Sequence, residues 1–220
     1  MKKISFFLCL CLFSYKIQAQ NTADTKLGAW YMYNGSHKLS HKFAIKSMAH
    51  FRYYELASEF QQEIYRLGIN YTFNAKTNLT IGYSFVSTDF DYKTPSSHIN
   101  ENRIYEDLNI KGNLYKFNLR HRIRLEHRFL ENLTSHWFRY DLNVKYPIST
   151  NWSVYAFNEI FLNIDQSKRF VQNWTGTGFL HKLNNNLKLQ LGYFYQKFAD
   201  TGFHRLQIGL ILNTNHTQNK

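Results

Sequence analysis

The side chains best suited to bind a charged ligand gather in one stretch, which reads LYKFNLRHRIRLEHRF from Leu114 to Phe129. Its charged and polar residues occupy every second position: Lys116, Asn118, Arg120, Arg122, Arg124, Glu126 and Arg128. Guanidinium groups spaced in this way can bind an anion together, or they can form a network with carboxylates. Both kinds of chemistry require a structure that places the arginines on one face.

Strict alternation indicates a β-strand, because successive side chains of a strand point to opposite faces of the sheet. At helical period, the same arginines would spread around the helix and leave no apolar stripe. The next stretch, 136–146, has the same pattern, with Arg139, Asp141, Asn143 and Lys145 on one parity. The two stretches therefore predict adjacent strands that each have a basic face and an apolar face.

The direction of the basic face follows from the cost of placing cations in hydrocarbon. Each Lys or Arg at the bilayer midplane costs about 2 to 4 kcal/mol, and the cost falls toward zero at the rims. For a row of such residues, the summed cost would approach the whole free energy of unfolding of a domain, which is about 5 to 15 kcal/mol. In a membrane barrel, the basic face must therefore point into the lumen.

The predicted lumen and anion-binding residues are the inward-facing charged side chains of these two strands and one acid of the following strand. They are Arg120, Arg122, Arg124, Glu126, Arg128, Arg139, Asp141, Lys145 and Glu159. Both parities are largely apolar around Glu159, so the pattern alone does not fix the direction of that side chain. Two interpretations stay open: a narrow pore or binding barrel for small anionic solutes, or a structural barrel filled by salt bridges between the arginines and acids that include Asp107.

Alternating stretches recur along nearly the whole chain and predict an all-β fold. The eleven recognisable strands lie near 27–34, 43–55, 61–73, 79–85, 101–110, 114–129, 136–146, 152–163, 169–181, 187–198 and 203–213. Short polar turns join most of them, which indicates an antiparallel up-and-down meander that closes into a transmembrane β-barrel and so removes its edges. Because bacterial barrels almost always have an even number of strands, we expect twelve, with ten as the fallback.

The chain is rich in tyrosine and phenylalanine, and its tryptophans also bear on the barrel hypothesis. Trp30, Trp137, Trp152 and Trp174 fall toward the ends of predicted strands or near predicted interfaces. This placement is typical of the aromatic girdle of a membrane barrel, while a role in the core stays equally open for Trp174.

The N-terminus has the three parts of a secretory signal peptide. Met1–Lys3 is basic, Ile4–Phe13 is almost entirely apolar, and Ala19 lies at a position typical of signal-peptidase cleavage. The apolar run is too short to cross a bilayer as a helix, which takes about twenty residues. We therefore expect residues 1–19 to be removed, which leaves one domain over 20–220 in the outer membrane of a Gram-negative bacterium.

The formal net charge of +12, with aromatic residues interleaved, is also typical of nucleic-acid-binding proteins. Secretion would separate the chain from nucleic acid, so the expected partners are outer-membrane lipid, lipopolysaccharide, the barrel-assembly machinery and a small-molecule solute of unknown identity. Cys9 and Cys11 fall in the signal peptide, and the spacing of His37 and His41 gives no ligand geometry on a turn and strand. We expect no metal site and no cofactor.

Two further alternatives remain. Some outer-membrane barrels hydrolyse lipids with a serine and a histidine, and His121 and His127 lie on the lipid-facing parity as candidates for the base. Because no serine occurs between residues 114 and 129, we expect a protein that is not an enzyme, with lipid acyl hydrolysis as the alternative. A soluble lipocalin-like periplasmic barrel would show the same alternation with its large apolar residues inside.

Three pieces of the chain resemble a known family. They are Arg122–Phe129 (RIRLEHRF), Asn158–Phe161 (NEIF) and the late run from Gly178 to Tyr193. These pieces resemble domain-of-unknown-function family 2490, and the similarity extends over most of the mature chain. The resemblance implies a secreted outer-membrane β-barrel protein and assigns no catalytic or binding residue. The polar tail Asn213–Lys220 departs from the aromatic residue with which barrel proteins commonly end.

Overall fold

The computed structural model describes residues 22–94 and 98–217. The predicted signal peptide 1–19, with its cleavage next to Ala19, lies outside the described residues. A short 3-10 turn, Ala23–Thr25, precedes the first strand. Within the described ranges, no helix is both long enough and apolar enough to span a membrane.

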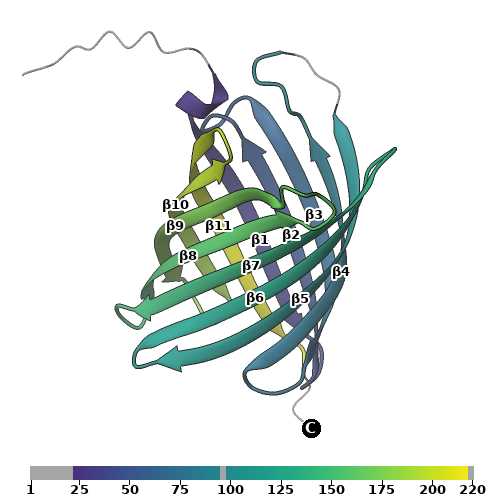
Figure 1. Ribbon diagram of the computed structural model, residues 1–220. Helices are drawn as coiled ribbons and strands as arrows, with labels where there is room; N and C mark the ends of the chain where they lie inside the picture. Colours follow the sequence, from purple (N-terminus) through teal and green to yellow (C-terminus); the bar gives the residue numbers. More distant parts are fainter. Residues whose placement is uncertain (1–21, 95–97, 218–220) are drawn as a thin grey trace, which may run out of the picture.

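Eleven strands form a single closed barrel (Figure 1). They are β1 (Leu27–Lys38), β2 (Phe43–Tyr53), β3 (Phe60–Thr72), β4 (Thr77–Thr88), β5 (Ile99–Leu114), β6 (Phe117–Phe129), β7 (Thr134–Pro147), β8 (Trp152–Asn163), β9 (Phe170–Lys182), β10 (Leu187–Phe198) and β11 (Gly202–Asn215). Consecutive strands pair antiparallel, and β1 pairs with β11 in parallel. The alternation of the sequence therefore predicts the fold class correctly.

The predicted count of twelve strands is wrong, and so is the fallback of ten, because the part of the chain that the structure describes forms eleven. The argument from even numbers assumes that the first and last strands run in opposite directions. In the structure β1 and β11 run in the same direction, and Leu27–Lys38 pairs in continuous register with His204–Asn215. This parallel seam closes the sheet, so the eleven strands leave no open edge.

The arginine-rich run is divided differently from the prediction of one strand over 114–129. A two-residue turn, Tyr115 and Lys116, ends β5 and begins β6, and Tyr115 takes a positive φ of 51°. Positive φ is typical of the tight turns that join antiparallel strands. The basic face of the run nevertheless survives, because all its arginines lie in β6.

The outer wall of the barrel is apolar and its inner wall is polar. Leu67, Ile69 and Leu191 point outward and are 59%, 64% and 57% exposed, whereas the inward Asn70 is only 4% exposed. A lipocalin-like barrel requires the opposite arrangement, with the large apolar side chains inside. The described strands contradict that alternative.

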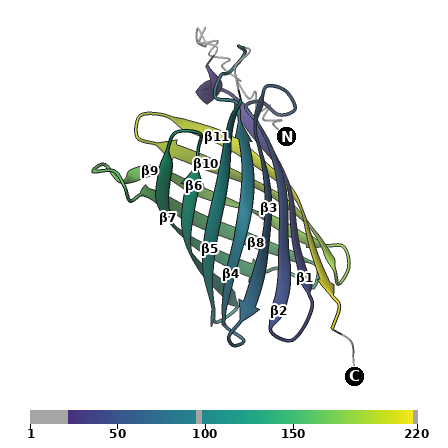
Figure 2. The same cartoon turned by 90° about the vertical axis from the view of Figure 1, so that its right-hand side faces the viewer.

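The two ends of the barrel differ in their connections. The connections after β1, β3, β5, β7 and β9 are turns of two to four residues. They lie at the lower end of the barrel in Figure 2, where β1 and β11 also finish. The connections after β2, β4, β6, β8 and β10 lie at the opposite end, beside the start of β1 (Figure 2). We call these the turn end and the loop end.

Aromatic side chains fill part of the lumen. A buried cluster consists of Trp30, Met32, Phe161, Trp174 and Phe194, and Trp137 packs against it. The predicted girdle is therefore wrong for Trp30 and Trp137, which share the parity of the inward polar residues on their strands. Trp174 is also inward, in the core role that the sequence left open. Trp152, at the start of β8, is half exposed on the other parity.

Candidate functional site

The lumen contains a cavity of about 1110 Å³, and basic residues dominate its wall. Ten lysines and arginines line the cavity, against four aspartates and glutamates. The acids are Glu101, Asp107, Asp141 and Glu159. The lumen is therefore the part of the molecule whose chemistry could hold an anion.

Glu126 on β6 is the centre of the charged network on one side of this lumen. Its side chain is completely buried. Its carboxylate lies within 4 Å of five guanidinium groups, those of Arg66, Arg103, Arg124, Arg128 and Arg139. The shortest of these contacts are 2.5 Å to Arg128 and 2.6 Å to Arg139. A buried carboxylate needs such partners, because an unpaired charge in a low-dielectric interior is strongly unfavourable.

The other acids of the wall extend the network along β5, β7 and β8. Both carboxylate oxygens of Asp107 accept hydrogen bonds from Arg124, in a bidentate arrangement that matches the guanidinium fork. Glu159 accepts from Arg122 at 2.7 Å and from Arg139 at 2.8 Å. These contacts also settle the direction of Glu159, which the sequence pattern left undetermined.

The two remaining acids pair closer to the two mouths. Asp141 accepts a hydrogen bond of 2.6 Å from Arg120, and Glu101 accepts one of 2.6 Å from Arg103. In total, seven arginines of the lumen have a carboxylate partner. Arg103 and Arg128 pair with acids of their own strands, while contacts such as Arg66–Glu126, Arg139–Glu126 and Arg122–Glu159 join different strands, so the network acts as a scaffold for one half of the barrel.

The aromatic cluster faces this network across the lumen. The ring centroids of Trp30 and Trp174 are 4.9 Å apart, and those of Phe161 and Trp174 are 4.3 Å apart. The guanidinium of Arg139 lies 4.1 Å from the ring of Phe161, at a distance suited to a cation–π interaction. The charged network and the aromatic cluster therefore form one packed interior that narrows the lumen.

Arg52 on β2 differs from the seven paired arginines. Its guanidinium lies 3.6 Å from the Trp30 ring, and its Nη1 donates a hydrogen bond of 2.7 Å to Gln62. Its Nε has no hydrogen-bond partner among the described residues, and no carboxylate in those ranges forms an ion pair with it. Because Arg52 lines the cavity, its charge is available to a ligand.

Arg205 on β11 is a second arginine without a carboxylate partner in the described part of the chain. It is completely buried, and its Nη1 donates a hydrogen bond of 3.3 Å to the backbone oxygen of Tyr54. Its guanidinium lies 4.6 Å from the Phe203 ring. Unlike Arg52, it does not line the cavity, so it adds positive potential rather than a contact surface.

The structure brings most of the predicted site residues together. Arg120, Arg122, Arg124, Arg128, Arg139, Asp141 and Glu159 line the cavity, and Glu126 is buried at the centre of their network. Lys145 lies apart from this network, half-buried near the turn end, where the charges of Lys188 and Lys111 act on it. The nine residues therefore divide into a paired network and one lysine outside it.

Several functional residues escaped the sequence analysis. The prediction concentrated on β6 and β7 and left out Arg52, Arg66 and Arg103, which come from β2, β3 and β5. The alternation of their own strands places each of them on the inward parity, so the same rule would have found them. What the rule could not show is that Arg66 and Arg103 reach the same carboxylate, because that contact depends on how the barrel closes.

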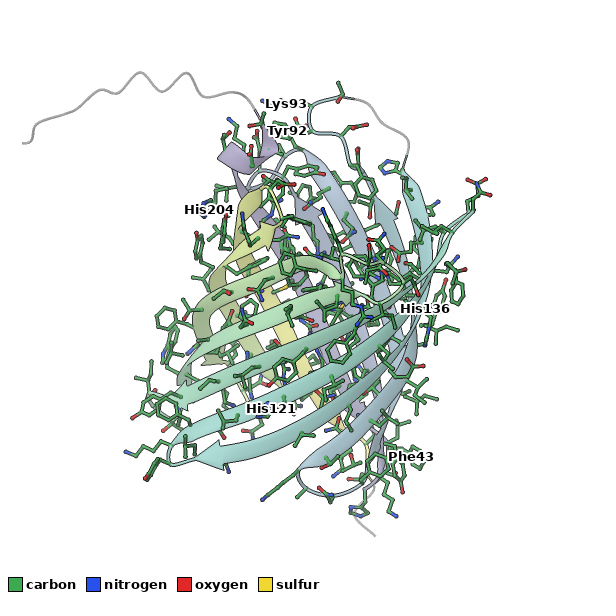
Figure 3. All side chains as sticks on the ribbon, in the orientation of Figure 1. Phe43, Tyr92, Lys93, His121, His136 and His204 are labelled. Carbon is green, nitrogen blue, oxygen red and sulfur yellow. The ribbon has the colours of Figure 1, made fainter. Side chains whose placement is uncertain are left out.

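The histidines considered as bases lie on the outer wall. His121 shares a hydrogen bond of 2.8 Å with the hydroxyl of Tyr140, and the Nδ1 atoms of His127 and His136 are 2.8 Å apart. Figure 3 shows His121 nearer the turn end than His136. Over the described residues, no serine or threonine hydroxyl bonds to these imidazoles, and no three ligating side chains are grouped to hold a metal ion.

The comparisons with known proteins agree with the resemblance of the three sequence pieces. The family described as Protein of unknown function (DUF2490) matches residues 27–207, from the start of β1 into β11. No curated protein matches the chain. Among solved structures, LpxR from Salmonella typhimurium is similar with a TM-score of 0.45 and 7% sequence identity, over 77% of this chain and 83% of that chain. Because the family match covers most of the barrel, the chain belongs to the DUF2490 family of proteins of unknown function.

Proposed function

We propose that this protein is an outer-membrane barrel whose lumen binds small anionic solutes. Residues 1–19 would direct secretion, and the apolar outer wall would face lipid and lipopolysaccharide after insertion by the barrel-assembly machinery. The arrangement supports this location because closed barrels leave no backbone group unpaired in hydrocarbon. Leu67, Ile69 and Leu191 then lie against acyl chains instead of water.

The observation that carries the proposed binding function is the imbalance of charge in the lumen. The cavity wall has ten basic residues and four acidic ones, and Glu126 behind it adds a fifth carboxylate, so the lumen's own carboxylates do not neutralise the wall. A narrow, low-dielectric space lined by one sign of charge concentrates ions of the opposite sign. The paired network supplies a rigid wall, and the unpaired cations supply the binding capacity.

Arg52 is the residue that we assign to contact the solute inside the lumen. Its guanidinium faces the cavity, stacks on Trp30 and lacks a carboxylate partner in the described ranges. Gln62 holds it by a hydrogen bond of 2.7 Å, so the side chain is already oriented before an anion arrives. Preorganised donors bind anions without a further cost of ordering.

The proposed function is binding and does not include lipid acyl hydrolysis. Such hydrolysis needs a nucleophile beside a base, and the outward imidazoles of His127 and His136 bond to each other. Binding of a soluble anion needs no such pair, and it uses the face of the barrel on which the cations lie.

The stacking of Arg52 on Trp30 provides a direct test. Titration of the refolded protein with inorganic phosphate should change the tryptophan fluorescence, because an anion at Arg52 alters the field at the indole ring 3.6 Å away. Arg52→Gln should weaken the apparent affinity about tenfold or more, as expected for loss of a charged hydrogen bond. Arg169→Gln removes the same charge from the exposed connection after β8 and serves as the matched control. Equal titration curves for the two variants would contradict the assignment.

A further inference from the structure

Acidic residues are distributed unequally between the two ends of the barrel. At the loop end, every connection contains an Asp or Glu, including Glu55, Asp89, Glu131, Asp165 and Asp200. At the turn end, the turns 39–42, 73–76, 115–116, 148–151 and 183–186 contain none. The connections therefore have a positive net charge at the turn end and a negative net charge at the loop end.

Cations of the inward parity gather at this end. Lys38 and Lys182 are the last residues of β1 and β9, and we call the five other cations the basic mouth. They are Lys46, Lys111, Arg120, Lys145 and Lys188, from β2, β5, β6, β7 and β10. Lys111 and Arg120 face each other in the β5–β6 register. Lys46, Lys111 and Arg120 line one cavity, and Lys145 pairs with Asn118, two residues before Arg120 on β6. The topology thus brings cations from five strands into electrostatic range around one opening.

The basic mouth holds almost no negative charge of its own. Its one neighbouring carboxylate in the described residues is Asp141, which already pairs with Arg120 at 2.6 Å. The Nζ atom of Lys46 donates a hydrogen bond of 2.7 Å to the hydroxyl of Ser36, a neutral partner. None of the four lysines forms an ion pair with a residue that the structure describes. Binding of an external anion would therefore relieve the repulsion between these lysines.

The positions of these cations restrict the kind of anion that can bind at the basic mouth. A ligand must reach several cations at once, because they come from strands on different sides of the opening. Ammonium groups are compact charges with three donors each and bind phosphoryl oxygens well. Lipid headgroups surround the outside of a barrel, whereas the five side chains share the inward parity.

We propose that the basic mouth binds a soluble anion that carries two or more phosphoryl groups. The proposal rests on the anion-binding lumen proposed above and names the class of solute that enters it. In bacterial barrels the short turns face the periplasm, so the basic mouth opens to that compartment. Arg52 lines the same cavity near the loop end of β2 and contacts anions that enter at the basic mouth and cross the lumen.

Calorimetric titration of the mature chain with inorganic tripolyphosphate tests the mouth directly. The protein is reconstituted in phosphatidylcholine bilayers, and its folded state is checked by heat-modifiable migration on a gel. The double variant Lys111→Gln/Lys145→Gln should bind tripolyphosphate about 25-fold more weakly, given about a fivefold loss for each lysine. The control Lys76→Gln/Lys116→Gln removes the same charge from turns at the same end and should keep the original affinity.

Two comparisons separate the possible sources of phosphate. Unmodified protein should bind tripolyphosphate more tightly than inorganic phosphate, and added salt should weaken the binding, because it screens the lysines. Replacing part of the phosphatidylcholine by phosphatidylglycerol should leave tripolyphosphate binding in place. Loss of binding in the anionic bilayer would show that lipid headgroups occupy the mouth and would overturn the proposal. Equal affinities for the two double variants would overturn it as well.

Failure of this proposal is distinguishable from failure of the anion-binding lumen. If tripolyphosphate does not bind while phosphate still changes the fluorescence through Arg52, the basic mouth is not a site, although the lumen binds anions. If neither anion binds, both proposals are wrong.

Discussion

At the scale of single residues, Glu126 is the carboxylate that holds the arginines of the charged wall together. Its completely buried carboxylate contacts five arginines, and the two closest contacts are direct hydrogen bonds to Arg128 and Arg139. Arg66 and Arg103 approach it at 3.6 and 3.8 Å. One negative charge therefore separates several positive charges that would otherwise repel each other in a low-dielectric interior.

Glu126→Gln should destabilise the barrel strongly. The amide keeps the size of the side chain and removes its charge. Arg66 then has no carboxylate partner among the described residues, and Arg103, Arg124, Arg128 and Arg139 each lose one of two. Losing one partner of a buried ion pair costs about 3 to 5 kcal/mol. Urea unfolding of the refolded variant, followed by tryptophan fluorescence, measures this loss of unfolding free energy. Glu131→Gln, in the exposed connection after β6, is the control and should change the value by less than about 0.5 kcal/mol. A similar small change for Glu126→Gln would show that the network does not stabilise the fold.

The inward direction of the charged residues was predictable from sequence, but their partners were not. Alternation and the cost of cations in lipid place Arg122, Arg124 and Arg139 inside without any structure. The sharing of Glu126 among β3, β5, β6 and β7 depends on curvature, which brings Arg66 within reach from a strand three positions away. A strand pattern contains no information on contacts across a lumen.

At the scale of elements, the parallel seam between β1 and β11 is the unusual feature of this barrel. It is the one parallel pair among the described strands, and it permits an odd strand number. Gly28 on β1 pairs with Arg205 on β11. A Cβ atom at Gly28 would lie 1.9 Å from Nη1 of Arg205 and 2.6 Å from the backbone oxygen of Tyr53. The buried arginine therefore crosses the seam directly over a residue that must lack a side chain.

Gly28→Ala should weaken the seam. The added methyl group must displace the Arg205 guanidinium, and the contact with backbone oxygen leaves little room, so we expect a loss of about 1 to 3 kcal/mol, typical of overpacking. Gly112→Ala is the matched control, because a Cβ atom at that strand position meets no atom within 4 Å. Urea unfolding of both variants gives the comparison. Equal midpoints would mean that Arg205 moves aside without cost.

The strands themselves were largely predictable, and their closure was not. The limits of β8 and β10 coincide with the alternating stretches at 152–163 and 187–198. The expected strand number of twelve is wrong because the parallel pairing of β1 with β11 closes a barrel of eleven strands, which is also the number of alternating stretches in the sequence. The direction of the pairing between β1 and β11 leaves no trace in the alternation, since parity is the same for parallel and antiparallel neighbours.

At the scale of the whole molecule, three asymmetries coincide. The outer wall is apolar while the inner wall is charged, one side of the lumen is ionic while the other is aromatic, and acidic connections occur at one end alone. The first asymmetry fits insertion in lipid, and the second makes a rigid and narrow interior. The third gives the lumen a direction, with an attractive potential for anions at the turn end.

The proposed location and the proposed anion binding both require that the apolar wall faces hydrocarbon and that the lumen contains water. Both cysteines fall within residues 1–19, so single cysteines can be introduced without background into protein produced from residue 20 onward. Spin labels at Ile69→Cys and Leu191→Cys report the outer wall, and a label at Asn34→Cys reports the cavity.

Collision of these labels with oxygen and with a water-soluble nickel complex, measured in reconstituted bilayers, is the most direct test. The account predicts that the labels at Ile69 and Leu191 collide mainly with oxygen, which concentrates in lipid, and that the label at Asn34 collides more with the nickel complex. Frequent nickel collisions at Ile69 and Leu191 would place the apolar wall in water and contradict the account.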